Sequence, residues 1–160
     1  MTQANGSLPH DRLTAALPFA LMALLAIVGG GLVAAIVAHA PSRPLVWLVA
    51  YLVLVAGIAQ AALGAGQAWL ALRAPSVRRV TAQCLLFNLG NAGVIAGTLC
   101  ASSLLAGSGT VAFVAALLML LHGTRGARAG LARSIYRGLL ALVAIGAAIG
   151  LLLSVLRAAN

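Results

Sequence analysis

Acidic residues are almost absent from this chain, and their absence excludes several kinds of chemistry. The 160 residues include a single Asp or Glu, which is Asp11. Carriers that move protons through intramembrane carboxylates, hydrolases that use paired carboxylates and carboxylate-based metal sites all need acids that this sequence does not have. Lysine is absent as well, so the ten residues counted as Lys or Arg are all arginines.

Cysteine and histidine are few, and their positions exclude further chemistry. Cys84 and Cys100 are 16 residues apart (100 − 84) on one expected helix, too far along its axis to form a disulfide. Of the three histidines, His39 and His122 fall at opposite ends of expected membrane spans, about a bilayer apart. We therefore expect no metal, haem or other cofactor. We also expect no enzymatic activity, because no nucleophile and base can be paired.

Most of the sequence is apolar. The composition is 63% hydrophobic and 7% charged, with a mean hydropathy of +1.12. That is too little polar surface for a water-soluble globule. The net charge of +9 does not indicate nucleic acid, because the arginines stand in short breaks between apolar runs. We expect an all-α, polytopic transmembrane bundle whose partner is the lipid bilayer, with no nucleic-acid partner.

Five uncharged segments give the expected spans, and four of them reach the length of about 17 to 25 residues that a spanning helix needs. A polar leader over residues 1–12 precedes a single bundle over residues 13–158. The segments are Leu13 to Ala38, Leu45 to Leu72, Val80 to Leu105, Gly109 to Leu121 and Gly138 to Leu156.

The arginines decide whether the short fourth segment crosses. With five spans and the N-terminus inside, eight of the ten arginines are cytoplasmic; with a re-entrant fourth segment the division is five to five. The positive-inside rule favours five spans with the C-terminus outside, and four spans plus a re-entrant segment is the alternative. We expect a multi-pass protein of the cell membrane, specifically the bacterial inner membrane.

Several arginines are expected at the cytoplasmic face, where each attracts anionic headgroups by about 1 kcal/mol. The simpler interpretation is that they only orient the chain. They are Arg78, Arg79, Arg125, Arg128, Arg133 and Arg137.

A polar stripe runs along the third expected span, within an arc of about 100° on a helical wheel. Another side of the same span carries Gly90, Gly93 and Gly97, where a neighbouring backbone can approach closely. A helix with both faces committed is expected at the centre of the bundle. The stripe consists of Thr81, Cys84, Asn88, Asn91, Thr98 and Ser102, with Ile95 among them.

The second span carries a seam of glycines and amides that is expected to face this stripe. Its members, Gly57, Gln60, Gly64 and Gln67, share an arc of about 80°. Gln60 and Asn91 both lie near the middle of their spans, where an unpartnered amide costs several kcal/mol. We predict that they bond to each other, to backbone or to trapped water.

Glycines at four-residue spacing recur in the fifth span. Gly146 and Gly150 form a small-residue seam there, as Gly57 and Gly64, and Gly93 and Gly97, do elsewhere. Such seams permit close helix packing, either inside the bundle or against a second protomer.

Two functional hypotheses follow from these patterns. The first is a small non-catalytic membrane protein, a subunit or accessory partner of a larger membrane complex. The second is a channel or carrier for a neutral or weakly polar solute, lined by the polar stripe, with an oligomer completing the pore.

Overall fold

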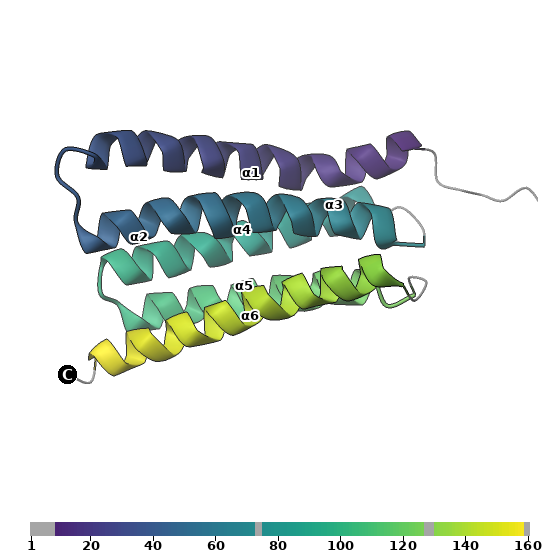
Figure 1. Cartoon of the computed structure of the whole chain (residues 1–160). Helices are drawn as coiled ribbons and strands as arrows, with labels where there is room; N and C mark the ends of the chain where they lie inside the picture. The colour runs from purple at the N-terminus through teal and green to yellow at the C-terminus, as the bar shows by residue number, and fades with distance from the viewer. Residues whose placement is uncertain (1–8, 73–74, 127–129, 159–160) are drawn as a thin grey trace, which may run out of the picture.

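The computed structural model describes residues 9–72, 75–126 and 130–158, and over these ranges the protein is a bundle of helices (Figure 1). Five helical segments are long and apolar enough to cross a membrane. The second of them is continuous but contains a π-helical stretch. The elements are α1 (Pro9–Val37), α2 (Arg43–Tyr51), η1 (Leu52–Ala59), α3 (Gln60–Leu70), α4 (Val77–Leu99), α5 (Ser103–Gly123) and α6 (Leu131–Ala158).

The expected all-α bundle with five spanning segments is confirmed, and the boundary between the third and fourth segments is corrected. Helix α4 ends at Leu99 rather than at Leu105, and α5 begins at Ser103. The fourth segment therefore forms a helix of 21 residues, which is long enough to cross. A re-entrant segment is not needed to account for it.

A tight turn after Leu99 produces this boundary. Ala101 adopts a left-handed conformation with φ of 53°. The Ser102 N–H donates to the Gly97 carbonyl at 2.8 Å, which is the Schellman pattern of a helix C-terminus. The Ser102 hydroxyl then accepts the Leu105 N–H at 3.4 Å as the N-cap of α5. The prediction that Ser102 belongs to the polar stripe of the third span is therefore wrong, because Ser102 lies in the turn between α4 and α5.

The glycine face of α4 packs directly against α5, as close backbone approach requires. A Cβ added at Gly93 would lie 2.7 Å from the Cα of Gly109. One added at Gly97 would collide with Ala106. Side chains larger than hydrogen are excluded there, so Gly93 and Gly97 are confirmed as packing residues, with α5 as their partner.

The glycines of the second span pack against α1. A Cβ at Gly57 would lie 2.5 Å from a side-chain carbon of Ile27, and one at Gly64 would collide with Phe19. Both are packing residues, as predicted. The expectation that this glycine seam faces the third span is wrong, because α1 occupies it.

The expectation that the third span is at the centre of the bundle is wrong: α4 packs on α5, α1 and α2 and leaves Leu85 and Leu89 exposed, whereas the second span packs against all four others. The ring of Phe87, fully buried, lies 6.3 Å from the ring of Phe19 on α1 and 4.7 Å from that of Phe113 on α5. These three aromatic side chains join α1, α4 and α5 in one core.

The bundle has one arginine-rich end, formed where α1, α4 and α6 begin and α3 and α5 end (Figure 1, right). One guanidinium nitrogen of Arg12 donates to the backbone carbonyls of Ala68 at 2.9 Å and Trp69 at 2.8 Å, which ties α1 to the end of α3. Arg43 lies at the opposite end. Of the arginines expected at headgroups, Arg78, Arg79, Arg125 and Arg137 are exposed at the first end, Arg133 is half-buried, and Arg128 lies outside the described residues.

Candidate intramembrane cavity

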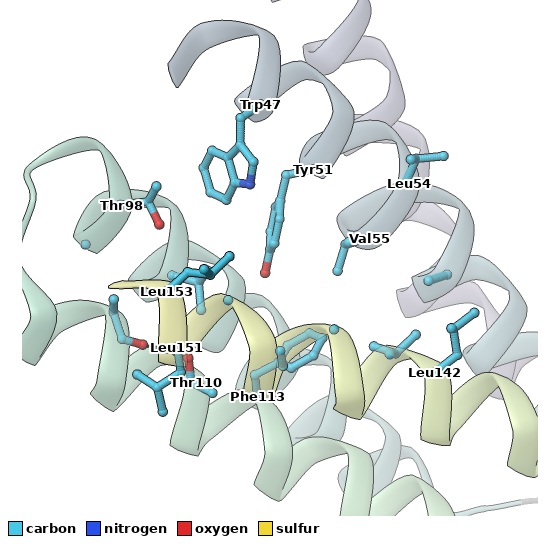
Figure 2. Close-up of a pocket in the computed structure, with 18 of the residues that line it drawn as sticks. Trp47, Tyr51, Leu54, Val55, Thr98, Thr110, Phe113, Leu142, Leu151 and Leu153 are labelled. Carbon is cyan, nitrogen blue, oxygen red and sulfur yellow. Dashed lines mark hydrogen bonds between the residues drawn. The ribbon is translucent and has the colours of Figure 1, made fainter. Parts of the chain in front are cut away.

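The clearest concave feature of the molecule is a cavity of about 700 Å³ inside the membrane-spanning region (Figure 2). Its three walls are the second span, the α4–α5 hairpin and α6. The cavity extends from the end of the bundle opposite the arginines toward the middle, from Ser103 at the start of α5 to Phe113.

The path of α6 leaves this space open. Near the arginine-rich end, Tyr136 is buried against Gly66 of α3, where a Cβ would lie 2.7 Å from a ring carbon of the tyrosine. Beyond that contact α6 slopes away from the second span (Figure 1). Gly146 and Gly150 line the cavity, and apart from the adjacent backbone of α6 no described atom lies within 4 Å of a Cβ added at either. The prediction that they pack inside the bundle is therefore wrong for the single chain.

Polar groups gather at one end of the cavity. The rings of Trp47 and Tyr51, one helical turn apart on the second span, lie 5.0 Å from each other and reach into the space, and Thr98 faces them from α4 (Figure 2). Ser102 and Ser103 line the same end. The rest of the lining is apolar apart from Thr110, whose hydroxyl donates to the Ala106 carbonyl at 2.8 Å, and none of the described side chains in the lining is charged.

A hydrogen bond joins this aromatic wall to α4. The Tyr51 hydroxyl donates to the Asn91 amide oxygen at 2.9 Å. The predicted pairing of Asn91 with Gln60 is therefore wrong, although the second span is the correct partner. Gln60 is fully buried, and neither its amide nitrogen nor its amide oxygen has a hydrogen-bond partner among the described residues.

The predicted stripe does not line a single space. Thr81 is exposed and Cys84 is buried. The Asn88 amide nitrogen donates to the Cys84 carbonyl at 2.8 Å, within its own helix. Of the helical stripe residues, only Thr98 lines the cavity.

Three glutamines form a second polar feature, buried in the core toward the arginine-rich half. Gln60, Gln67 and Gln83 are each at most 2% exposed. All three have amide atoms without a hydrogen-bond partner in the described part of the chain. Gln67 lies against Gly123 of α5, where a Cβ would be 2.7 Å from its amide nitrogen. Burying an amide without a hydrogen-bond partner costs free energy. A water or other small polar molecule that hydrogen-bonds to these amides would therefore be favoured in this part of the core.

Sequence reasoning missed three of these residues as candidate site residues. Trp47 and Tyr51 belong neither to the polar stripe nor to a glycine seam, yet their four-residue spacing places both on one helix face and is a usable signal. Gln83 was missed because it lies about 100° from Cys84 on the helical wheel, outside the arc of the stripe.

Comparisons with protein-family models, with curated proteins and with solved structures find no match to this chain. Among the residues that the structure describes, no three His, Cys, Asp or Glu side chains gather into a metal-binding group. The cavity is therefore the feature of this structure that points to a function.

Proposed function

We propose that this chain is a non-catalytic accessory protein, a subunit or assembly partner of a larger membrane complex. It acts through the half of the bundle opposite the arginines, where the cavity receives an apolar element of the membrane. The observation that carries the proposal is the open space between the second span and α6, walled by three separate segments. Pockets of about 300 to 1,000 Å³ with mostly apolar linings are typical of binding sites.

The rim of the cavity supports binding from within the bilayer. Leu54, Ile58, Leu142 and Leu153 line the cavity and are also among the exposed large apolar side chains. An apolar rim on the lipid-facing surface favours entry of a hydrophobic group sideways from the membrane.

Site-specific crosslinking in native membranes tests the accessory role. In a background with Cys84→Ala and Cys100→Ala, a cysteine at Leu142 on the cavity rim carries a photoreactive crosslinker. The matched control is a cysteine at Leu32 on α1, since Leu142 is 67% exposed and Leu32 is 63% exposed. We expect one membrane protein to co-purify in fixed ratio and to be crosslinked from position 142 but not from position 32. A chain that purifies alone, with no adduct from position 142, contradicts the proposal.

A second candidate function is a channel or carrier for a neutral or weakly polar solute. The observation that favours it is the set of buried glutamine amides without partners, which together with Asn91 would offer hydrogen bonds to a passing solute.

Labelling of introduced cysteines by a charged thiol reagent separates the two functions, because only thiolates in contact with water react appreciably. The test positions are Asn91 and Thr98. Leu89, which is exposed on the lipid side of α4, is the control, since a cysteine at Gly93 or Gly97 would collide with α5. The accessory role predicts no labelling at Asn91. The carrier is favoured if cysteines at Asn91 and Thr98 are labelled, if a candidate solute slows that labelling, and if a cysteine at Leu89 stays unlabelled.

We also propose that the arginine-rich end is cytoplasmic and that the membrane is the bacterial inner membrane, with the exposed arginines at anionic headgroups. The positive-inside rule supports this orientation. A reporter fused after Asn160 is expected on the periplasmic or extracellular side, and one inserted near Gly126 in the cytoplasm. If both reporters give the same location, the proposed topology is wrong.

A further inference from the structure

We propose that the cavity binds one neutral amphipathic lipid, with an uncharged hydroxyl or carbonyl head and a flexible apolar chain. This inference rests on the proposed function, because it names the occupant of the same cavity. Three properties of the cavity point to this ligand: the distribution of its polar groups, the lack of charge among its described lining residues, and its size.

The polar groups lie in the outer part of the cavity, where Leu151 and Leu153 also line it, and the inner part is apolar. Thr98 and Ser103 lie at the ends of α4 and α5, at the end of the bundle opposite the arginines. Counted from the start of α2 at Arg43, with a rise of about 1.5 Å per residue, Trp47 and Tyr51 lie about 6 and 12 Å further into the membrane-spanning region. Deeper still, the lining consists of Ile58, Phe113, Leu139, Leu142 and Val143. A ligand that fits this gradient has a polar head near the membrane surface and an apolar chain toward the middle.

Hydrogen-bonding capacity remains open at the polar end. The Tyr51 hydroxyl donates its proton to Asn91, so its oxygen still has lone pairs that can accept. The Trp47 indole is a donor only, and the Thr98 hydroxyl can donate and accept. Donors and acceptors of this kind match a hydroxyl or carbonyl group.

The absence of charge in the lining sets the character of the head group. Of the described residues that line the cavity, none is an arginine, histidine or acid. A charged head drawn into such a site would lose its hydration without gaining a counter-charge, which costs far more than burying a hydroxyl or carbonyl. Phosphate-bearing lipids are therefore disfavoured in the cavity, although they form the bulk of the surrounding bilayer.

A lipid fits the cavity better than a helix of a partner protein does. A transmembrane helix satisfies its backbone polar groups internally, so it does not need a polar end in its binding site. A helix is also about 10 Å or more across, whereas the volume of about 700 Å³ lies within the range of small-ligand sites. The π-helical wall adds support, because π-helical turns occur frequently at functional sites.

Photolabelling of the purified protein in phosphatidylcholine vesicles tests the occupant. The probe is a diacylglycerol with a diazirine in one acyl chain, and adducts are mapped by mass spectrometry. We expect adducts on cavity residues of η1 and α6, and we expect excess unlabelled diacylglycerol, but not phosphatidylcholine, to suppress them.

The matched variants are Gly150→Leu, which fills the cavity, and Gly31→Leu on α1. Both glycines have space for a side chain, since apart from the adjacent backbone of its own helix no described atom lies within 4 Å of an added Cβ. Gly150→Leu should lower cavity adducts about tenfold, the effect of losing about 1.4 kcal/mol of binding free energy, while Gly31→Leu leaves them unchanged. Unaltered circular dichroism and gel-filtration profiles show that both variants fold.

Three results would overturn the inference. The first is adducts spread evenly over α1 and α6 that excess diacylglycerol does not suppress. The second is equal labelling of the cavity by a phosphatidylcholine probe, which would remove the preference for a neutral head. The third is a cavity that stays unlabelled while position 142 crosslinks to a protein in native membranes, which would overturn the lipid occupant and leave the accessory role supported.

Discussion

Two pairs of glycines with the same four-residue spacing have opposite surroundings in this bundle. Gly93 and Gly97 on α4 lie against the backbone of α5, where no side-chain carbon fits. Gly146 and Gly150 on α6 face open space and line the cavity. Two glycines four residues apart allow another backbone to approach closely, but they do not determine whether a neighbouring segment is there. In the first case the neighbour is α5 of the same chain, and in the second no described residue supplies one.

The largest expected effect tests this contrast directly by placing the same side chain in both seams. Gly97→Leu should lower the free energy of unfolding by about 3 kcal/mol, because the side chain must displace the backbone of α5 near Ala106. Gly150→Leu should not lower it and should raise it by up to roughly 0.5 to 1 kcal/mol, since space is available and a glycine is removed from a helix interior. Steric-trap unfolding in lipid bicelles measures both. Equal destabilisation by the two substitutions would show that the α6 seam is packed.

A smaller effect is expected at the hydrogen bond that joins the cavity wall to the core. Tyr51→Phe removes the hydroxyl and leaves the buried Asn91 amide oxygen without its donor, so it should cost about 1 kcal/mol. Added to Asn91→Leu, the same change should cost less, with a coupling free energy of about 0.6 kcal/mol. Gln60→Leu is the control and should add independently of Asn91→Leu. Coupling of Asn91 to Gln60 and not to Tyr51 would contradict the structure.

The smallest effect concerns the turn that closes the α4–α5 hairpin. Ala101 is held at φ of 53°, a conformation that glycine adopts without strain. Ala101→Gly should therefore raise the free energy of unfolding by about 0.5 kcal/mol, the relief of strain being partly offset by greater freedom of the unfolded chain. Ala96→Gly, inside α4, should instead destabilise by roughly 0.5 to 1 kcal/mol. Destabilisation by both changes would argue against the left-handed turn.

The features that sequence predicts well here are those set by local composition and periodicity. Uncharged length predicts the five spans, and glycine spacing predicts the tight face of α4. The turn at Ala101 escapes prediction because alanine and serine stand where glycine or proline usually signal a turn. The cavity escapes because it depends on the direction of α6 after its contact at Tyr136, a tertiary property. The partner of Asn91 escapes because several polar side chains on the second span were compatible with it.

The π-helical segment makes the second span a joint between two rotational phases. The Gln60 N–H donates to the Val55 carbonyl, five residues back instead of four. If Leu52–Ala59 were wound as α-helix with the same number of residues, Trp47 and Tyr51 would turn by about 100° relative to α3, because a π-helical turn takes up about one residue more than an α-helical turn. The aromatic side chains would then leave the cavity and Asn91, while Gly64 kept its contact with α1. The cavity wall therefore depends on the winding of the residues between the two halves of this span as much as on their identity.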